Sequence, residues 1–510
     1  MTSSDKDGFV GLLTARAAAE PDRIYARFSG EPLSYAELER RSAAFAGYLR
    51  ARGIVAGDRV AVMMRNSIAT IAVVFGLARA GVAWVPVNAQ QRGEGLNYLL
   101  THSSPRLVVT DAELAPQIAE AMGPDSALPV LLHARGGDLD AVLAGTIGFD
   151  EPAPAADAVF AIMYTSGTTG RPKGVIVSHR MLRLAAESVL YLSDAKPGEV
   201  FFIWEPLYHI GGAQLLPLPM IRDVTLAMVE RFSASRFWAQ VREEGATHIH
   251  YLGGILQILL KQPPSALDRE HGVRIAWGGG CPADIWPQFR DRFGVEIREC
   301  YGMTEASSLT TCNTSGVVGS VGRPMPWFTV RLLDSEGRPV AAGERGEIVV
   351  ETSIPGAIFP GYLDNSDATA KALRNGALHT GDLGSFDAEG NLSFHGRMTD
   401  SVRCRGENVS AWEVEHVAAE HDAVEDCAMI GVAADIGEQD IKLFVKPRHG
   451  AIIDPQALSG WLGQRLAPYQ NPRYIALVDE FERTASQRIM KHKLSPRLDD
   501  CWDRAAVTRR

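Results

Sequence analysis

Residues 164–175 read Tyr-Thr-Ser-Gly-Thr-Thr-Gly-Arg-Pro-Lys-Gly-Val, and apolar runs precede and follow this glycine- and hydroxyl-rich segment. Backbone N–H groups and hydroxyls in such a loop can surround phosphate oxygens, and Lys173 and Arg171 add positive charge. The spacing excludes the GxxxxGK[ST] loop, because Pro172 stands where a pattern counted from Gly167 needs glycine. The segment therefore predicts a phosphate-binding loop of another kind, with an ordinary surface hairpin as the alternative.

The same string resembles the signature of the adenylate-forming superfamily, to which acyl-CoA synthetases, peptide-synthetase adenylation domains and luciferases belong. Further segments follow in the family's order, and the likeness extends over about residues 10–495. It implies that the loop binds the β- and γ-phosphates of ATP. The residues implicated there are Thr165, Ser166, Gly167, Thr168, Thr169 and Lys173.

Residues 299–305 read Glu-Cys-Tyr-Gly-Met-Thr-Glu, which taken alone fits any strand that ends in a turn. Downstream of the phosphate loop, the segment resembles the family's YGxTE element. The resemblance implies that Tyr301 packs against adenine beside Gly302, that Thr304 holds the α-phosphate and that Glu305 binds Mg²⁺. A carboxylate suits that last role, because Mg²⁺ prefers one or two carboxylates together with phosphate oxygens and waters.

Two further short motifs are expected to reach the ribose. The turn Thr-Gly-Asp at 380–382 is common in proteins, but by resemblance Asp382 accepts hydrogen bonds from the ribose hydroxyls, as an ionised carboxylate can. Residues 396–400 resemble the family's GRxxD, which implies that Arg397 reaches the ribose. Asp400 would then be the hinge of a mobile C-terminal domain.

Residues 403–415 resemble the loop and helix that follow this hinge in the family. There the loop turns toward the active site for thioester formation, which implicates Gly406 and Glu407 in binding coenzyme A. Gly406 would let the pantetheine arm pass close to the backbone, because glycine has no Cβ. The alternative is a β-turn followed by a surface helix.

Two segments are expected to surround the acyl group. The glycines of residues 278–282 follow a predicted strand at 273–277 and permit close backbone approach, with Gly279, Gly280 and Cys281 on the nucleotide side. By resemblance, residues 204–212 hold His209 beside the substrate carboxylate, although a lone histidine among apolar residues is more often a core residue. Small residues and aromatic walls predict a roomy site for a bulky aromatic, polycyclic or branched acid rather than acetate. The predicted acyl pocket consists of Trp204, Tyr208, His209, Gly211, Gly212, Gly253, Trp277, Gly278 and Met303.

The chain departs from the family pattern near its C-terminus. Relatives carry T-x-x-G-K-I, whose Lys contacts the acyl carboxylate and the phosphate during adenylation. Here Gln487 occupies the Gly position and Arg488 the Lys position. Arg is a planar fork whereas Lys is a compact ammonium, so the geometry of charge neutralisation changes. Lys491 is an alternative source of the charge.

Alternating helices and strands dominate the first third of the chain, with strands expected at 59–64, 83–87, 107–110 and 130–132. A capping box at 34–37 predicts a helix that places Leu38, Phe45 and Leu49 on one face and ends at Gly53. Short strands at 328–333, 346–351 and 392–395 indicate a small β-barrel or sheet. With the resemblance, this predicts an α/β fold: an N-terminal domain of two α/β sheets plus a small β-barrel (residues 1–399), then a small mobile α+β domain (residues 400–510).

Composition bounds the class of protein. The 510-residue chain has a net charge of −10 and a pI near 5.8, which argues against nucleic acid or an anionic membrane as the main partner. Its six cysteines lack metal-binding spacing and are expected to be free thiols in a reducing compartment. The polar N-terminus and the Arg79-containing apolar stretch at 68–87 predict a cytoplasmic protein without a membrane span.

The resemblance implies an acid–thiol ligase that uses ATP, Mg²⁺ and coenzyme A. A carboxylate attacks the α-phosphorus to give acyl-AMP and pyrophosphate, and the thiol then takes the acyl group. The predicted catalytic residues are Thr304, Glu305, His209 and Arg488. The alternatives are an enzyme that loads an acyl carrier protein, a member with one half-reaction, and a non-catalytic nucleotide binder. The sequence leaves open whether the protein forms a homodimer.

Overall fold

The computed structural model describes residues 8–165, 172–398, 401–404, 407–434, 439–466, 468–483 and 489–507. They fall into two compact units, which we describe separately. The first comprises the described residues up to 330 together with 350–378, and the second comprises 331–349 and the described residues from 379 onward. The predicted border at Asp400 lies outside the described residues and stays a prediction.

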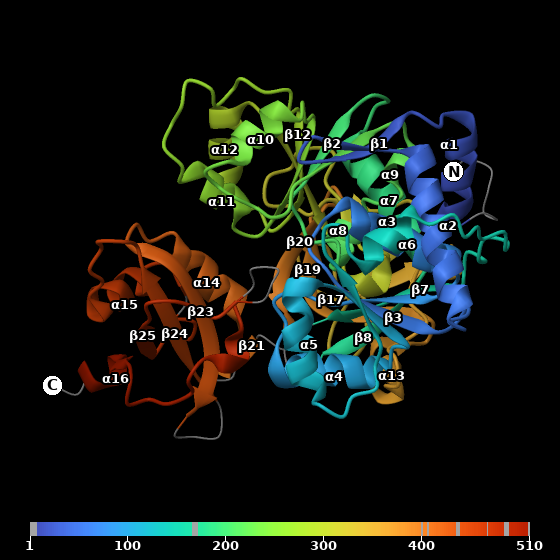
Figure 1. Cartoon of the computed structure of the whole chain (residues 1–510). Helices are drawn as coiled ribbons and strands as arrows, with labels where there is room; N and C mark the ends of the chain where they lie inside the picture. The colour runs from blue at the N-terminus through green and yellow to red at the C-terminus, as the bar shows by residue number, and fades with distance from the viewer. Residues whose placement is uncertain are drawn as a thin grey trace. The chain divides into compact units, whose positions relative to one another are not determined.

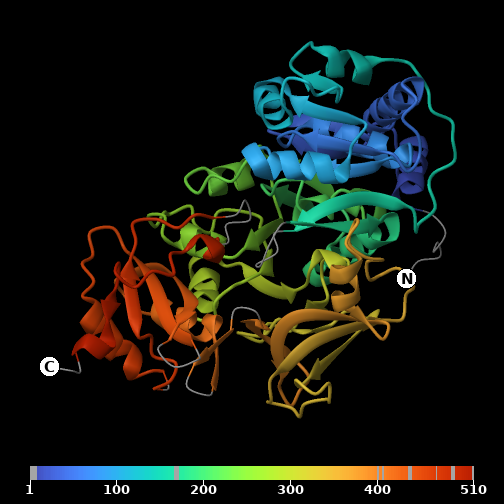
Figure 2. The same ribbon diagram turned by 90° about the horizontal axis from the view of Figure 1, so that it is seen from below.

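The first unit contains a six-stranded sheet in the order β6-β5-β3-β4-β7-β8, parallel except for the β7–β8 hairpin. Blue and cyan helices lie against its blue and cyan strands in Figure 2. The four strands predicted in the first third are confirmed to within one residue. Residues of β3, β4 and β5 pack with α4 and α5 in one buried cluster. The strands are β3 (Arg59–Met63), β4 (Ala83–Pro86), β5 (Leu107–Asp111), β6 (Val130–His133), β7 (Val159–Thr165) and β8 (Lys173–Ser178). The helices are α3 (Ile68–Arg79), α4 (Gly93–Ser103), η1 (Ala112–Leu114), α5 (Ala115–Met122) and α6 (Asp138–Ala144).

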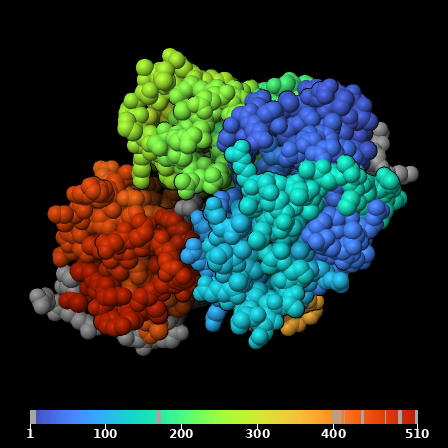
Figure 3. All heavy atoms as spheres, viewed as in Figure 1, coloured from blue at the N-terminus to red at the C-terminus, as the bar shows by residue number. Residues whose placement is uncertain are grey.

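Helix α2 (Tyr35–Ala51) begins where the capping box predicts, because Ser34 Oγ accepts a hydrogen bond from the Glu37 N–H at 3.2 Å. The predicted face, Leu38, Phe45 and Leu49, is fully buried. The helix packs against α1 (Phe9–Ala19) and α3. In the space-filling view, the blue and cyan atoms of residues 9–144 form one continuous surface on the viewed face (Figure 3).

A nine-stranded sheet forms the centre of the first unit, in the order β15-β14-β13-β12-β11-β9-β10-β1-β2. It is parallel from β13 to β1 and antiparallel at both edges. Helices α10, α11 and α12 pack together on one of its faces (Figure 1). The strands are β1 (Ile24–Phe28), β2 (Glu31–Ser34), β9 (Val200–Ile203), β10 (Thr225–Met228), β11 (His248–Leu252), β12 (Ile275–Gly279), β13 (Glu296–Tyr301), β14 (Thr311–Cys312) and β15 (Arg323–Pro324). The helices are α7 (His179–Ser193), α8 (Ile210–Ala213), α9 (Leu218–Ile221), α10 (Phe237–Glu243), α11 (Ile255–Leu260), α12 (Ile285–Phe293) and η2 (Thr304–Ala306).

Strand β12 corrects one prediction, because it lies two residues later than the expected 273–277. The apolar residues at 273–277 suggested the earlier bounds, but the hydrogen-bonded pairing of β12 with β11 and β13 sets the observed ones. Gly278 pairs with Tyr251 on one side and with Glu299 on the other. The loops that follow the carboxyl ends of β11, β12 and β13 carry three of the predicted segments. In open parallel sheets this edge is where ligands bind.

A five-stranded sheet follows the order β16-β17-β19-β18, with β20 paired to β19. The three strands predicted here are confirmed, two of them with longer C-terminal ends. The elements are β16 (Phe328–Leu333), β17 (Gly346–Thr352), α13 (Ser366–Ala372), β18 (Leu373–Arg374), β19 (Ala377–Phe386) and β20 (Leu392–Arg397).

The C-terminal part of the second unit combines the hairpin β21–β22 with a four-stranded sheet in the order β23-β24-β25-β26. Helix α14 packs along β23, and α15 packs beside β25 (Figure 1). Lys442 on β24 is fully buried, and its Nζ donates to Ser495 O at 3.1 Å and to Asp500 Oδ1 at 2.5 Å. The elements are β21 (Ser401–Cys404), β22 (Glu407–Ser410), α14 (Ala411–Ala419), β23 (Val424–Ala433), β24 (Gln439–Pro447), α15 (Pro455–Gly463), β25 (Tyr474–Leu477), η4 (Lys491–Lys493), β26 (Trp502–Asp503) and α16 (Arg504–Val507).

Within the described ranges, no helix has the length and apolar character that crossing a bilayer requires.

Candidate active site

The β7–β8 hairpin fixes the two ends of the predicted phosphate loop. Thr165 and Lys173 face each other in the antiparallel register. Tyr98 OH donates to Pro172 O at 3.1 Å, which holds the start of the second strand. The loop residues Ser166, Gly167, Thr168 and Thr169 lie outside the described residues. The structure therefore places Thr165 and Lys173 on either side of the segment.

The Tyr-Gly-Met-Thr-Glu segment leaves the end of β13 and turns into η2. Gly302 has no room for a side chain, because a Cβ there would lie 1.7 Å from Ser308 O. The backbone oxygen of Glu305 accepts a hydrogen bond from the Phe359 N–H at 2.9 Å, so a distant segment holds the turn. Met303 is half-buried. The buried predicted residues of the motif are Tyr301, Thr304 and Glu305.

Tyr362 contacts two side chains with predicted roles: Lys173, which was assigned to the phosphates, and Glu305, which was assigned to Mg²⁺. Its hydroxyl donates to Glu305 Oε1 at 2.8 Å, and Lys173 Nζ lies 4.9 Å from the centre of its ring. A cation over an aromatic face is attracted by the ring quadrupole. The sequence reasoning missed Tyr362, which lies 57 positions from Glu305 and belongs to no motif that was recognised.

The glycine loop after β12 packs against the end of β11. A Cβ at Gly280 would lie 3.2 Å from Gly253 Cα, and the Gly253 N–H donates to Gly279 O at 3.0 Å. Glu299, which the sequence reasoning gave no role, accepts hydrogen bonds from the N–H groups of Gly280 and Cys281. The predicted nucleotide residues Gly279, Gly280 and Cys281 are thus held in one fixed loop.

The predicted acyl-pocket residues Trp204 and Trp277 are both buried. His250 lies on β11, between β12, which carries Trp277, and β9, which ends just before Trp204. The His250 ring is 4.2 Å from the Trp277 ring by centroids, and Trp204 Nε1 donates to His250 O at 2.8 Å. His250 Nδ1 lies 2.7 Å from Glu205 Oε2, and both side chains are almost fully buried. The predicted apolar wall therefore contains an ionisable pair that the sequence reasoning missed.

The segment after Trp204 is tightly packed at its glycines. A Cβ at Gly211 would lie 2.4 Å from Glu205 Oε1, and one at Gly212 would lie 2.3 Å from Pro206 O. His209 occupies the N-cap position of the short helix α8, and its ring lies 4.7 Å from that of Tyr208. Burial and the Glu205 charge raise the pKa of Tyr208 to about 12. Tyr208 therefore stays protonated at neutral pH and can act only as a neutral wall or hydrogen-bonding group.

The predicted ribose residues meet in the second unit. Asp382 on β19 and Arg397 on β20 are cross-strand partners, and Arg397 Nε lies 3.3 Å from Asp382 Oδ1. Asp382 is 4% exposed, whereas about a third of the Arg397 side chain is exposed. Glu347 supports the turn, because its carboxylate accepts from the Gly381 N–H at 3.2 Å. The structure thus places these two predicted residues next to each other, and their role at the ribose stays a prediction.

The predicted C-terminal groups are described only in part. Lys491 Nζ lies 2.8 Å from Glu415 Oε1 on α14, and Glu415 also accepts from the Met429 N–H at 2.6 Å. This ion pair engages Lys491 within the second unit. Glu407 begins strand β22. The predicted residues Asp400, Gly406 and Arg488 lie outside the described residues.

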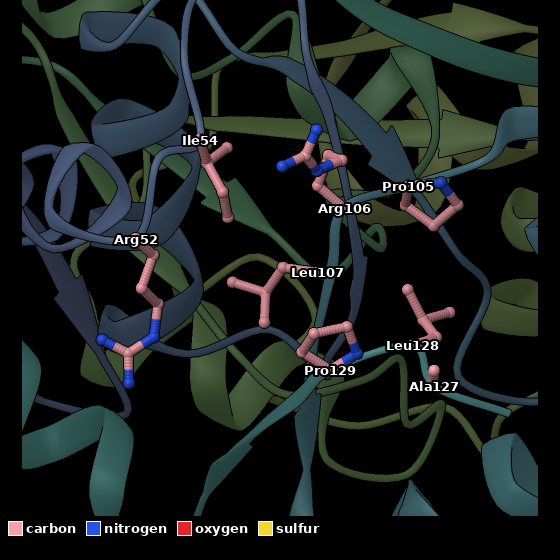
Figure 4. Close-up of a pocket in the computed structure, with 8 residues that line it drawn as sticks. All are labelled: Arg52, Ile54, Pro105, Arg106, Leu107, Ala127, Leu128 and Pro129. Atoms are coloured by element: carbon pink, nitrogen blue, oxygen red, sulfur yellow. The ribbon is translucent and has the colours of Figure 1, made fainter.

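A cavity of about 510 Å³ lies elsewhere on the first unit (Figure 4). It is lined by residues that include Arg52, Arg106 and Leu107, near the start of β5. Among the residues that the structure describes, none of those assigned to the active site lines it. It is therefore separate from the candidate active site.

A family model described as "AMP-binding enzyme" matches residues 13–363, well over half of the chain. The chain belongs to that family. A second model, the C-terminal domain of AMP-binding enzymes, matches residues 413–488.

Individual relatives match along nearly the whole chain. Feruloyl-CoA synthase of Amycolatopsis sp is 33% identical over 493 residues, covering 95% of this chain and 97% of that protein. Crotonobetaine/carnitine–CoA ligase of Shigella dysenteriae serotype 1 is 31% identical, covering 90% and 92%. The solved structure of ATP-bound MatB from Rhodopseudomonas palustris is 28% identical with a TM-score of 0.84, covering 95% and 97%.

These matches confirm the resemblance to adenylate-forming enzymes and assign the chain to their acyl-CoA ligase branch. They confirm the enzyme class, an AMP-forming acid–thiol ligase. The mixed α/β fold with a larger N-terminal and a smaller C-terminal part is confirmed as well.

Proposed function

We propose that this AMP-binding enzyme is an ATP- and Mg²⁺-dependent ligase that activates a bulky, aromatic carboxylic acid as acyl-AMP and transfers the acyl group to coenzyme A. The observation that carries the proposal is the Tyr362 contact with both Glu305 and Lys173. It brings a buried carboxylate and a cation, both assigned from the sequence to the phosphate chemistry, to one side chain.

The residues of the first unit have distinct roles in this proposal. Lys173 neutralises charge on the phosphates, and Thr304 holds the α-phosphate as the carboxylate attacks it. Glu305 is the proposed Mg²⁺ ligand, since a single buried carboxylate together with phosphate oxygens suits that ion. Mg²⁺ supplies charge neutralisation and orients the pyrophosphate leaving group. His209 lies beside the substrate carboxylate.

The residues of the second unit complete the proposal. Asp382 and Arg397 bind the ribose, and Arg488 neutralises charge between carboxylate and α-phosphate. A rotation at Asp400 then exchanges the Arg488 segment for the Gly406 and Glu407 loop, which binds coenzyme A. One site would thereby serve both half-reactions, as conformational gating does in other enzymes.

Two lines of support favour an aromatic acid. Trp204 and Trp277 flank His250 in the predicted pocket, and flat aromatic side chains bind flat substrates. One relative, at 33% identity, is named for feruloyl-CoA synthesis. The buried Glu205–His250 pair adds a polar feature that suits a ring substituent capable of hydrogen bonding.

Mass spectrometry tests the proposed reaction directly. The enzyme is incubated with ATP, Mg²⁺, coenzyme A and a pool of aromatic, polycyclic, branched and short acids. We expect aromatic acyl-CoA and AMP, with acetate turned over least. Acyl-AMP without acyl-CoA would point to a different acceptor, such as a carrier protein, and preferred turnover of acetate would contradict the proposed substrate class.

The Tyr362 contact predicts a specific defect. Tyr362→Phe keeps the ring beneath Lys173 but removes the hydroxyl that donates to Glu305, so we expect kcat for acyl-AMP formation to fall roughly tenfold and the Mg²⁺ requirement to rise. The matched control is Tyr191→Phe, at a position on α7 that is about half exposed. A Tyr362→Phe enzyme with wild-type kcat and an unchanged Mg²⁺ titration would show that the contact is dispensable.

A further inference from the structure

Glu299 is an ionisable side chain inside the central sheet, and the proposed reaction does not use it. It lies on β13 two positions before Tyr301, is 4% exposed, and pairs in register with Gly278 of β12. An ionised carboxylate in such a place is costly unless hydrogen bonds compensate for the lost water.

The Glu299 carboxylate accepts hydrogen bonds from donors on two neighbouring segments, β11 and the loop after β12. The Gly280 N–H donates to Oε1, and the Cys281 N–H lies 3.2 Å from both carboxylate oxygens. Tyr251 OH, from the fully buried Tyr251 side chain of β11, donates to Oε2. The carboxylate thus links its own strand, β13, to β11 and to the loop that follows β12.

The backbone of the loop that Glu299 contacts has a conformation and a close packing that only glycine allows. Gly280 has a φ of +93°, and its neighbour Gly278 could not carry a Cβ, which would lie 1.9 Å from Tyr251 O. The Gly280 and Cys281 N–H groups point at Glu299, so the carboxylate fixes the orientation of two successive peptide units. Hydrogen bonds from backbone N–H groups to an ionised acceptor are stronger than those to a neutral one.

We propose that Glu299 is a positioning residue that holds the Gly279–Cys281 loop in the geometry that binds the adenine side of the nucleotide. The inference rests on the proposed function, in which this loop and Tyr301 contact the nucleotide. Glu299 does not touch the reacting atoms. Its loss therefore weakens nucleotide binding more than it affects binding of the acid.

The charge state of Glu299 gives the inference a second readout. Burial raises the pKa of Glu299 to about 7, although the bonds from Tyr251, Gly280 and Cys281 favour the charged form. The carboxylate form, which accepts from every donor around it, therefore gains population as pH rises through neutrality. The titratable groups facing it are Tyr251, Cys281 and Cys300, and burial raises the pKa of each, so they stay neutral in that range.

The test compares AMP affinity, by isothermal titration calorimetry, for wild type, Glu299→Gln and Tyr251→Phe between pH 6 and pH 8. We expect wild-type affinity to increase with pH, whereas Glu299→Gln should bind AMP about tenfold more weakly at pH 8 and show no such increase. Tyr251→Phe should show a smaller loss in the same direction. Glu296→Gln, on the exposed face of the same strand, is the matched control.

Steady-state kinetics on the same variants distinguishes a specific effect on the nucleotide-binding loop from a general disruption of the active site. We expect the KM for ATP to rise in Glu299→Gln while the KM for the acid stays within twofold of wild type. Wild-type AMP affinity and pH dependence in Glu299→Gln would overturn the inference. Failure of the wild type to form acyl-AMP would instead count against the proposed function, because the AMP measurement needs no turnover.

Discussion

Glu305→Gln is expected to reduce acyl-AMP formation by about 10³-fold, because the change removes the charge of the proposed Mg²⁺ ligand. The amide is nearly isosteric, and its oxygen can still accept from Tyr362 OH, so the fold should persist. Pyrophosphate release in the presence of acid and ATP measures the rate, and a Mg²⁺ titration measures the altered requirement.

The control for this change is Glu243→Gln, at an exposed position on α10. Equal thermal unfolding midpoints for the two variants would show that the lower rate of acyl-AMP formation in Glu305→Gln does not result from lower stability. A Glu305→Gln enzyme with wild-type rate and Mg²⁺ dependence would remove Glu305 from the proposed site.

The second large effect is expected at Arg488, which occupies the position where relatives carry lysine. Arg488→Ala should slow acyl-AMP formation about 100-fold, since it removes the charge that the proposal places between carboxylate and α-phosphate. Thioester formation from synthetic acyl-AMP should remain near the wild-type rate, because that step follows the proposed rotation. Separate assays of the two half-reactions measure the difference.

Lys491→Ala is the matched comparison, and the structure predicts that it leaves adenylation unchanged. Its Nζ lies 2.8 Å from Glu415, and both side chains are about a quarter exposed, so the pair contributes at most about 1 kcal/mol to stability. The reverse pattern, with slow adenylation in Lys491→Ala and a normal rate in Arg488→Ala, would make Lys491 the functional cation.

Local signals predicted the elements well. The capping hydroxyl of Ser34 and the strand at β5 follow from short-range chemistry, namely an N-cap hydrogen bond and a run of β-branched residues. Where bounds depend on a partner, the prediction was less accurate. Strand β12 is shifted because Gly278 pairs with β11 and β13, and no composition rule selects glycine for a strand.

The same distinction holds in the candidate site. Asp382 and Arg397 could be assigned to the site as a prediction because each lies in a recognisable motif, and the register of β19 and β20 places them opposite each other. Tyr362, Glu299 and the Glu205–His250 pair act through contacts between segments distant in sequence. A single sequence gives no information on such contacts, and the strand order that creates them is not encoded in local periodicity.

Transfer of ¹⁸O from a labelled carboxylic acid tests the central claim most directly. When the carboxylate attacks the α-phosphorus of ATP and coenzyme A then attacks the carbonyl carbon, one carboxylate oxygen leaves with AMP. Using an aromatic acid that the pooled assay shows to be turned over, we predict AMP that carries one ¹⁸O and unlabelled pyrophosphate. Label in inorganic phosphate, together with ADP, would show an acyl-phosphate route and contradict the account.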